Sequence, residues 1–461
     1  GGFQVNLQGT KQTGMGHLGT SFYLGASSAY FNPAMMGLDS NKFNIEAGAS
    51  FIMSSVAYQN QGTGRTELTD NPVSTPFYLY ATYKINEIET VKQKIEQEDM
   101  DAVVQVLQAD YLTQGPKVKE FEQKFAKYVE SQYAVAVNNA TSGLHLSVLS
   151  LGLKKGDRVI TTPITFAASA NCIRYVGGEV WFADIDPNTY LLSIDSVREL
   201  LESKPKGFFK GVIPVDFAGL PVNTEEFYNL AQEHNLWIIE DACHAPGGYF
   251  IDSKGEKQKC GSSRYSDLSV FSFHPVKHIA CGEGGMITTN SEKLYKKLSL
   301  LRTHGITKEN MSKNHGGWFY EMQELGFNYR LTDIQSALGI TQLAKNDVGV
   351  VRRNEITETY KKAFNNKIKF QSLPIGTYNA HHLFVIEVEE RKELYDFLRT
   401  HNIFAQIHYI PVHTLPYYKE IGYGSASLVN SENYYSKCIS LPMYPSLTNE
   451  EQAFVIEKVL S

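Results

Sequence analysis

The chain has 461 residues, which is too many for one ordinary hydrophobic core and enough for two or three domains. A composition of 42% hydrophobic and 20% charged residues excludes an intrinsically disordered chain. The net charge is −6 and no basic stripe is present, which argues against a nucleic-acid binder.

The first 87 residues are rich in Gly, Ser, Asn and aromatic residues and poor in helix formers. Apolar residues occupy alternate positions from Phe43 to Met53 and again from Phe77 to Tyr83, with a polar loop between the two runs. This period of two predicts two strands, and their aromatic ends are typical of outer-membrane barrels. Residues 1–87 are therefore predicted to form a barrel-like fragment.

This fragment resembles the N-terminus of the outer-membrane long-chain fatty-acid transporter family. The resemblance rests on Gly2-Phe-Gln4, the glycine-rich stretch through Gly19, and Asn32-Pro-Ala34. Two strands cannot close a barrel, and an open sheet edge cannot sit in lipid. We therefore expect a fused remnant rather than a transporter, and a lipid-transport fragment remains the alternative from another class of protein.

From Ile88 onward, helical and strand patterns alternate. Residues 89–107 predict an amphipathic helix, and a helix is predicted from Thr141 to Leu153. Short apolar runs predict strands at 134–137, 158–161, 180–183, 211–215 and 237–240. Strands separated by helices form a mostly parallel sheet. We predict a large domain over 88–345 and a smaller C-terminal domain over 346–461, which begins near a helix from Val350 to Phe364.

Residues 138–143, Asn-Asn-Ala-Thr-Ser-Gly, lie between a predicted strand and a predicted helix. Free backbone amides at a helix N-terminus favour an anion such as phosphate, and the hydroxyls of Thr141 and Ser142 add donors. Taken alone, the pattern is more typical of a capped helix start.

Asp241 directly follows the apolar run 237–240. A carboxylate at the carboxyl end of a parallel strand points into the ligand crevice of an open α/β sheet. Paired with a pyridine nitrogen, it would keep that ring protonated and make it an electron sink. A turn residue or a helix cap would also account for this position.

Lys277 ends the run Ser272-Phe-His-Pro-Val-Lys277, and the turn Gly282-Glu-Gly-Gly285 follows it. A partly desolvated amine has a lowered pKa and can form a Schiff base. A single lysine at a strand end is usually a solvated surface residue. The order of phosphate loop, carboxylate and lysine along the chain is what predicts pyridoxal phosphate chemistry.

Residues 88–461 resemble the DegT/DnrJ/EryC1/StrS family of pyridoxal-phosphate-dependent sugar aminotransferases. The resemblance implies an α/β fold, the fold-type I (aspartate aminotransferase-like) architecture with a mostly parallel sheet and a smaller C-terminal α/β domain. The shared motifs are Leu112-Thr-Gln-Gly-Pro116, Thr161-Thr-Pro-Ile-Thr-Phe166-Ala-Ala, Glu240-Asp-Ala, Gly282-Glu-Gly-Gly285 and Leu325-Gly-Phe-Asn-Tyr-Arg-Leu-Thr-Asp333. Within this family, the chain most resembles the branch of pseudaminic acid biosynthesis. The two share the motifs Ser272 to Lys277 and Val215-Asp-Phe-Ala-Gly219, and a histidine at position 244.

The resemblance implies a role for each matching residue. Lys277 would bind the cofactor covalently and move the proton, and Asp241 would pair with the ring nitrogen. The other cofactor-binding residues would be Thr141, Ser142, Phe166, His244, Ser272 and, in the partner subunit's site, Asn328. The substrate-facing residues would be Arg330, His408, Tyr409 and His413. Many relatives carry Gln in place of His244, and this departure leaves open which cofactor atom His244 would contact. Many also carry Ser-Gly-Thr in place of Asn139-Ala-Thr141, a change that removes no chemical group.

The implied reaction transfers an amino group from glutamate to a nucleotide-linked 4-keto-6-deoxy sugar, such as a UDP-linked N-acetylhexosamine, for surface glycans. The implied assembly is a homodimer with shared active sites. Two alternatives on the same fold are a sugar dehydrase and an inactive homologue. The related dehydrase branch carries His where this chain has Lys277, so the lysine argues against a dehydrase. The five scattered cysteines, without a CxxC pair, predict reduced thiols and no metal site. With no apolar run long enough to cross a membrane and no signal peptide expected, we expect a cytoplasmic enzyme without membrane partners.

Overall fold

The computed structural model describes residues 43–49, 57–59, 66–68 and 77–83, and all residues from 88 onward except 93, 310, 313, 314, 366 and 426. Contacts within the chain divide it into two compact units, Gly1–Glu87 and Ile88–Ser461. Each unit is described by itself below.

The first unit contains both of the strands predicted there. β1 (Phe43–Ala49) pairs with β4 (Phe77–Tyr83) in an antiparallel ladder that places Phe43 opposite Tyr83. A second, shorter ladder joins β2 (Ala57–Gln59) to β3 (Thr66–Leu68). The glycine-rich start, on which the transporter resemblance rests, lies outside the described residues.

A seven-stranded sheet forms the centre of the second unit, in the order β6-β14-β13-β10-β9-β7-β8. Its strands are β6 (Tyr133–Val137), β7 (Arg158–Thr161), β8 (Glu179–Phe182), β9 (Phe209–Ile213), β10 (Trp237–Asp241), β13 (Leu268–Ser272) and β14 (Gly285–Thr289). Only β14 among them runs against the others, because it is antiparallel to both β13 and β6. The predicted mostly parallel sheet is therefore confirmed. Its strands are almost continuously apolar and buried, as expected for a sheet covered on both faces.

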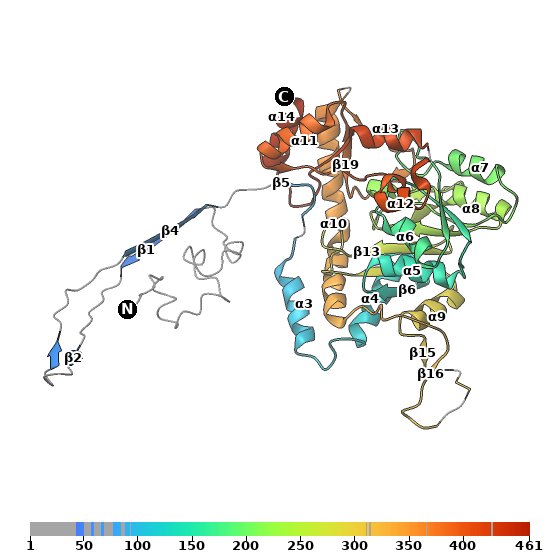
Figure 1. Ribbon diagram of the computed structural model, residues 1–461, viewed down its shortest axis with the longest axis horizontal. Coiled ribbons are helices and arrows are strands. Elements are labelled where there is room, and N and C mark those ends of the chain that lie inside the picture. The colour runs from blue at the N-terminus through green and yellow to red at the C-terminus, as the bar shows by residue number, and fades with distance from the viewer. Residues whose placement is uncertain are drawn as a thin grey trace. The chain divides into compact units, whose positions relative to one another are not determined.

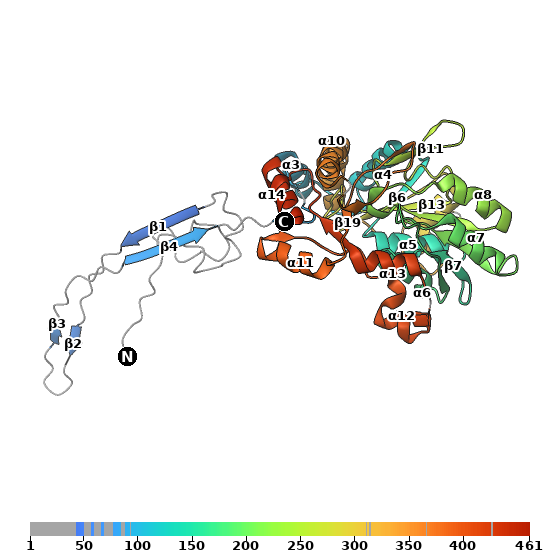
Figure 2. The same ribbon diagram turned by 90° about the horizontal axis from the view of Figure 1, so that it is seen from above.

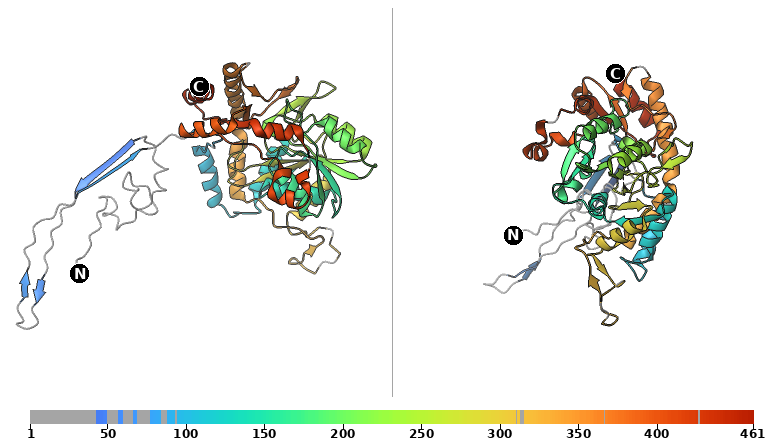
Figure 3. Two further views of the ribbon diagram at one scale, coloured as in Figure 1. Left: turned by 45° about the horizontal axis from the view of Figure 1, so that its top comes forward. Right: turned by 90° about the vertical axis from the view of Figure 1, so that its right-hand side faces the viewer.

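Helices cover this sheet (Figure 1), and some of them begin at a side chain that caps the helix. The Asn139 side chain accepts a hydrogen bond from the Ser142 amide at the start of one helix, and Ser193 and Ser291 cap two others. The helices are α3 (Gln97–Leu107), α4 (Pro116–Val129), α5 (Ala140–Ser150), α6 (Ala168–Tyr175), α7 (Ile194–Glu202), α8 (Thr224–His234) and α9 (Glu292–Leu301). The β15–β16 hairpin (Ile306–Thr307 and Glu321–Met322) projects from this layer (Figure 3).

The long helix α10 (Asp333–Phe364) links the sheet to the C-terminal part and lies beside α3 (Figure 2). Its 32 residues span about 48 Å at 1.5 Å per residue. Thr332 and Gln335 close a capping box at its start. The helix runs straight through the predicted domain boundary at residue 345, which stays a prediction.

The second half of α10 was predicted, but the first half was not. Polar residues such as Ser336, Gln342 and Asn346 are buried along it, so no apolar stripe marks the helix. The predicted helix over 89–107 begins later than expected, at Gln97. The residues before it include β5 (Ile88–Glu89), which pairs in parallel with β20 (Ile403–Phe404).

The motifs at 112–116 and 325–333, both identified from the sequence, meet at the N-terminus of α4. The buried Asp333 carboxylate accepts hydrogen bonds from the Gly115 amide at 2.7 Å and the Lys117 amide at 2.8 Å. A Cβ at position 115 would lie 2.5 Å from the Tyr111 Cβ, so only glycine fits there. These motif residues therefore hold the fold together, because the carboxylate satisfies helix amides that would otherwise lack partners.

The C-terminal part combines a small sheet, β17-β19-β21, with three longer helices. Its elements are β17 (Lys369–Phe370), β19 (Phe384–Glu387), β21 (Cys438–Leu441), α11 (Arg391–Thr400), α12 (Pro416–Glu420), α13 (Val429–Lys437) and α14 (Asn449–Leu460). A separate sheet joins β11 (Tyr249–Ile251), β12 (Lys257–Lys259) and β18 (Thr377–Tyr378). Among the described residues, no helix combines the length and apolar character that a membrane crossing requires.

Candidate active site

A cavity of about 800 Å³ opens at the carboxyl edge of the central sheet, and we call it the Lys277 cavity. Open α/β sheets bind their ligands at this edge. Residues from seven segments of the chain line it: Asn139, Ala140, Thr141, Ser142, Leu144, His145, Thr165, Phe166, Ala168, Ser169, Tyr175, Val215, Asp241, Cys243, His244, Ser272, His274, Val276, Lys277, Glu283, Tyr329 and Tyr409. The structure thus brings together in one cavity most of the site residues predicted from the sequence. The first of them, Thr141, and the last, Tyr409, span 269 positions of the chain.

The N-terminus of α5 forms one wall of the Lys277 cavity. The Asn139 side chain caps the helix at the Ser142 amide, at 2.8 Å, which leaves the first amides and the hydroxyls of Thr141 and Ser142 at the rim. A Cβ on Gly285 would lie 2.7 Å from the Ala140 nitrogen. Gly285 therefore lets β14 pack directly against the helix start.

Asp241 ends β10 and is only 5% exposed. The Ser169 hydroxyl donates to its Oδ2 at 2.6 Å, and the Cys243 amide donates to its Oδ1 at 3.3 Å. Both hydrogen bonds fix the orientation of the carboxyl group. Ser169 was missed because a serine within a helix carries no sequence signal of its own, and the shared motif ends one residue earlier, at Ala168.

Lys277 lies in the turn that follows β13, where its amide donates to the His274 carbonyl at 2.9 Å. Burial lowers the pKa of the Lys277 amine, while Cys243 and Asp241 act in the opposite direction. An amine with a lowered pKa is more often unprotonated at neutral pH, and the unprotonated form is the nucleophile. This agrees with the environment predicted from the sequence.

Phe166 and Tyr409 supply aromatic rings to the Lys277 cavity, with centroids 6.3 Å apart. The Phe166 side chain is 63% exposed. A large apolar ring exposed inside a cavity offers its face to a flat ligand. The predicted stacking residue is therefore placed where a cofactor ring could contact it.

His244 lies beneath this wall, 4% exposed. The Ala218 amide donates to its Nδ1 at 3.3 Å, so Nε2 carries the proton and donates to the Tyr409 oxygen at 3.2 Å. Burial and the nearby Lys277 hold the pKa of His244 well below its usual range. A neutral His244 therefore orients the Tyr409 hydroxyl at the cavity wall.

Four predicted residues lie outside the lining of the Lys277 cavity. Asn328 is exposed and Arg330 forms no ion pair with any residue that the structure describes. His408 contacts the Ser440 hydroxyl through Nδ1, at 2.9 Å. His413 is buried, with Nε2 3.3 Å from the Glu432 carboxylate. The lining residues that the sequence did not nominate include His145, Tyr175, Glu283 and Tyr329.

Three fully buried histidines predict acid-sensitive stability. Burial lowers the pKa of His381 to about 3 and holds the pKa values of His244 and His382 well below the usual range. The unfolded chain then binds more protons than the folded protein below an unfolded pKa of ~6.5, so stability is present above that pH and is lost as the pH falls. Each histidine that is neutral in the folded protein and protonated in the unfolded chain lowers the free energy of unfolding by about 1.4 kcal/mol per pH unit. Urea unfolding at pH 7.5 and 5.5 measures this loss.

The control for this prediction is His234→Asn, at the half-exposed end of α8. It should leave the pH dependence unchanged, whereas His381→Asn should flatten it. Equal urea midpoints at both pH values in the unaltered protein would contradict the prediction.

The donor set of the Lys277 cavity fits pyridoxal phosphate. The helix N-terminus with its hydroxyls suits a phosphate, the Asp241 carboxylate suits a protonated ring nitrogen, and Lys277 suits a covalent bond to an aldehyde. Phe166 offers a face for the ring.

The sequence matches the DegT/DnrJ/EryC1/StrS aminotransferase family over residues 93–460. A UDP-4-amino-4,6-dideoxy-N-acetyl-beta-L-altrosamine transaminase of Campylobacter jejuni is 38% identical over 377 residues, covering 80% of this chain and 96% of the relative. The solved structure of Helicobacter pylori PseC, an aminotransferase involved in pseudaminic acid biosynthesis, matches with a TM-score of 0.73 and 29% identity, covering 81% of this chain and 98% of PseC.

A sugar aminotransferase from Streptococcus pneumoniae, Spr1654 in its PLP form, matches with a TM-score of 0.73 and 26% identity, covering 81% of this chain and 97% of that protein. The comparisons give no support to the transporter resemblance of residues 1–87, which stays a prediction. The family match spans most of the chain and agrees with the donor set of the Lys277 cavity. The chain therefore belongs to the DegT/DnrJ/EryC1/StrS aminotransferase family and is a pyridoxal-phosphate-dependent aminotransferase.

Proposed function

We propose that this aminotransferase moves an amino group from glutamate to the C4 ketone of a UDP-linked 4-keto-6-deoxy-N-acetylhexosamine, giving a 4-amino sugar for surface glycans. The observation that carries the proposal is the joint presence of Lys277, Asp241 and the α5 N-terminus in one cavity. The substrate class follows the known substrates named for the Campylobacter relative and the pathway named for PseC. The sugar, its nucleotide carrier and the donor are proposals.

Six residues of the Lys277 cavity would then have defined tasks. Thr141, Ser142 and Ser272 would bind the phosphate, and Asp241 would hold a proton on the ring nitrogen. When bound, pyridoxal phosphate supplies an electron-withdrawing ring and an aldehyde that carries the amino group between the two substrates. The Lys277 amine would bind the aldehyde and, once released, would move a proton between the two carbon atoms on either side of the transferred nitrogen. Phe166 would exclude water from one face of the ring.

We further propose a homodimer whose active sites are shared. Asn328 is exposed next to the projecting hairpin, and the segment 318–325 presents four large apolar side chains to solvent, namely Trp318, Tyr320, Met322 and Leu325. Such a concentration of exposed apolar side chains marks an interaction surface. A second copy of the chain would cover it and would receive Asn328 at its cofactor phosphate.

The test supplies glutamate with labelled nitrogen and several keto sugars, and follows the label by mass spectrometry. We expect the label in the amino sugar, together with release of 2-oxoglutarate. Transfer of the label to a dTDP-linked sugar alone would show that the nucleotide of the substrate is dTDP and not UDP. Conversion of glutamate to 2-oxoglutarate without labelling of any nucleotide sugar would overturn the sugar assignment while leaving the aminotransferase assignment intact.

Deletion of residues 1–87 is expected to leave transamination within about twofold of the full chain. The second unit keeps its own first element, because β5 begins at Ile88 and pairs with β20. Steady-state rates and melting temperatures of the two proteins provide the measurement. Deletion of residues 1–90 is the matched comparison, since it removes β5 and should lower the melting temperature. A folded dimer of residues 88–461 that lacks activity would contradict the prediction.

A further inference from the structure

Three titratable side chains meet in the core near the end of β10. One carboxyl oxygen of Asp216, one of Glu240 and the Cys260 Sγ all lie within 4.8 Å of one another. The three residues are between 0% and 4% exposed. Among the described residues, neither Asp216 nor Glu240 forms an ion pair. Two carboxyl groups so close and so deeply buried cannot both carry a negative charge without a cation beside them.

The two carboxyl groups differ in their hydrogen bonds. Glu240 Oε2 accepts from the Gly261 amide at 3.0 Å and from the Ser269 hydroxyl at 2.5 Å. Asp216 Oδ1 accepts from the Val222 amide at 2.8 Å, while Asp216 Oδ2 is buried without a partner. Two donors stabilise a negative charge on Glu240. A proton on Asp216 Oδ2 would give that oxygen a hydrogen bond to Glu240 and would remove the second charge.

The surroundings of this carboxyl pair favour a neutral Asp216. Burial and the nearby Glu240 raise the pKa of Asp216 well above its usual range. Burial also raises the pKa of Glu240, but its hydrogen bonds oppose that rise. The other titratable groups nearby are Asp241, Cys243 and Cys260, none of which supplies a positive charge, and burial raises the pKa of both thiols. One proton shared by the pair therefore removes the repulsion within it.

The loop that carries Asp216 also holds two groups of the Lys277 cavity. The Asp216 amide donates to the Asp241 carbonyl at 3.1 Å, and the Asp241 amide donates to the Pro214 carbonyl at 2.9 Å. Two residues after Asp216, the Ala218 amide donates to His244 Nδ1 at 3.3 Å. Ala218 has a φ of 61°, which is uncommon for a residue with a side chain and has to be imposed by its surroundings. A displacement of Asp216 would therefore reach both Asp241 and His244.

We propose that Asp216 and Glu240 share one proton, and that this proton keeps the loop 214–218 where it positions Asp241 and His244 at the Lys277 cavity. Asp216 and Glu240 are positioning residues, because neither is among the residues that line the cavity. Loss of the proton would leave two like charges in the core, and their repulsion would move the loop. The proposal concerns the aminotransferase chemistry and does not depend on which sugar accepts the amino group.

Infrared spectroscopy of the cofactor-loaded protein at pH 7.5 detects the shared proton, because a protonated carboxyl group and a carboxylate absorb at different frequencies. We expect a band of a protonated carboxyl group in the unaltered protein that is lost in Asp216→Asn. The asparagine side chain keeps the shape of the aspartic acid, and its Nδ2 donates to Glu240 without a titratable proton.

Asp252→Asn is the matched control, because Asp252 is also a buried carboxyl group. It accepts hydrogen bonds from the amides of Lys254 and Glu256 and from the side chains of Gln258 and Tyr265. Although burial opposes them, these hydrogen bonds hold the pKa of Asp252 below its usual range. Asp252 is therefore charged at pH 7.5, and its replacement should leave the band unchanged.

Urea unfolding measures the same proton through its effect on stability. The unfolded chain releases this proton above a carboxyl pKa of ~3.9 and the folded pair keeps it, so its contribution to stability falls as the pH rises. Asp216→Asn lacks this contribution. From pH 5.5 to 7.5, the unfolding constant of the unaltered protein should rise relative to that of Asp216→Asn, roughly tenfold per pH unit. The buried histidines are common to both proteins and cancel in this comparison.

The glutamate half-reaction tests the positioning role. Asp216→Asn should lower its single-turnover rate by less than about threefold, whereas Asp216→Ala should lower it roughly tenfold or more and change the visible absorbance of the bound cofactor. Full activity in Asp216→Ala would overturn the positioning role. A band that persists in Asp216→Asn would overturn the shared proton, as would stoichiometric zinc in the purified protein, since a cation would replace the proton. If Asp216→Ala does not fold, the infrared band and the urea series decide.

Discussion

Replacement of Lys277 by alanine is expected to reduce transamination roughly 10⁴-fold or more, because one side chain supplies both the covalent attachment and the proton transfer. The surrounding cavity should survive, since the amide of residue 277 still donates to the His274 carbonyl. Visible absorbance after addition of the cofactor, together with borohydride reduction and mass spectrometry, measures the covalent bond. The labelled-glutamate assay measures the transfer.

Lys277→Arg is the matched variant, because it keeps a positive charge and cannot form the same covalent bond. Both variants should still bind the cofactor noncovalently through the α5 N-terminus and Asp241. A Lys277→Ala protein that retains a tenth of the original rate would exclude Lys277 as the base. A covalently labelled peptide from elsewhere in the chain would assign the attachment to another lysine.

Asp241→Asn is expected to lower the rate roughly 10²- to 10³-fold, the cost of losing one partner of a buried charged pair. The asparagine side chain keeps nearly the same shape: its Oδ1 can still accept from the Cys243 amide, and its Nδ2 can donate to the Ser169 hydroxyl oxygen. The lower rate should therefore result from the loss of the proton on the ring nitrogen rather than from a change in the shape of the site. Single-turnover rates with glutamate measure this step separately from the sugar step.

Ser169→Ala tests the orientation of Asp241 without removing its charge. Its effect should be smaller than that of Asp241→Asn, because the Cys243 amide still contacts the carboxylate. An Asp241→Asn enzyme with an unchanged single-turnover rate would show that the carboxylate does not act on the cofactor. A larger loss in Ser169→Ala than in Asp241→Asn would also contradict this assignment.

The sequence was most informative where a residue's chemistry and its place at a strand end coincide. Asp241, Ser272 and Lys277 follow two neighbouring parallel strands, so local pattern and sheet topology together placed them in one cavity. The parallel sheet was predictable for the same reason, since each strand is a short apolar run between helices. The roles assigned to these residues stay predictions.

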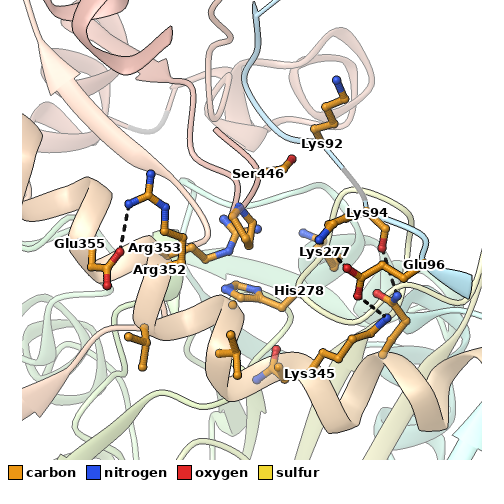
Figure 4. A pocket seen from close by; sticks show the side chains of 16 residues that line it. Lys92, Lys94, Glu96, Lys277, His278, Lys345, Arg352, Arg353, Glu355 and Ser446 are labelled. Carbon is orange, nitrogen blue, oxygen red and sulfur yellow. Dashed lines mark hydrogen bonds and ion pairs between the residues drawn. The ribbon is translucent and has the colours of Figure 1, made fainter. Parts of the chain in front are cut away.

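The remaining features depend on contacts between distant segments. The first half of α10 escaped prediction because its buried face includes Gln342 and Asn346. β5 was read as the beginning of a helix because its partner strand lies far along the chain. A second cavity, of about 650 Å³, is lined by residues near 92, 345, 353 and 446 (Figure 4), and no pattern within a single segment predicts it.

The pairing of β5 with β20 also has a consequence for the order of events during synthesis. Ile403 is 315 residues later than its partner Ile88. At ~5–20 residues per second, translation takes roughly 15 to 60 seconds to deliver β20 after β5 has left the ribosome. During that interval the central sheet can form, while β5 stays without its partner. The C-terminal part is therefore completed last, and a chain stalled before residue 403 would keep an unpaired β5 edge accessible to chaperones.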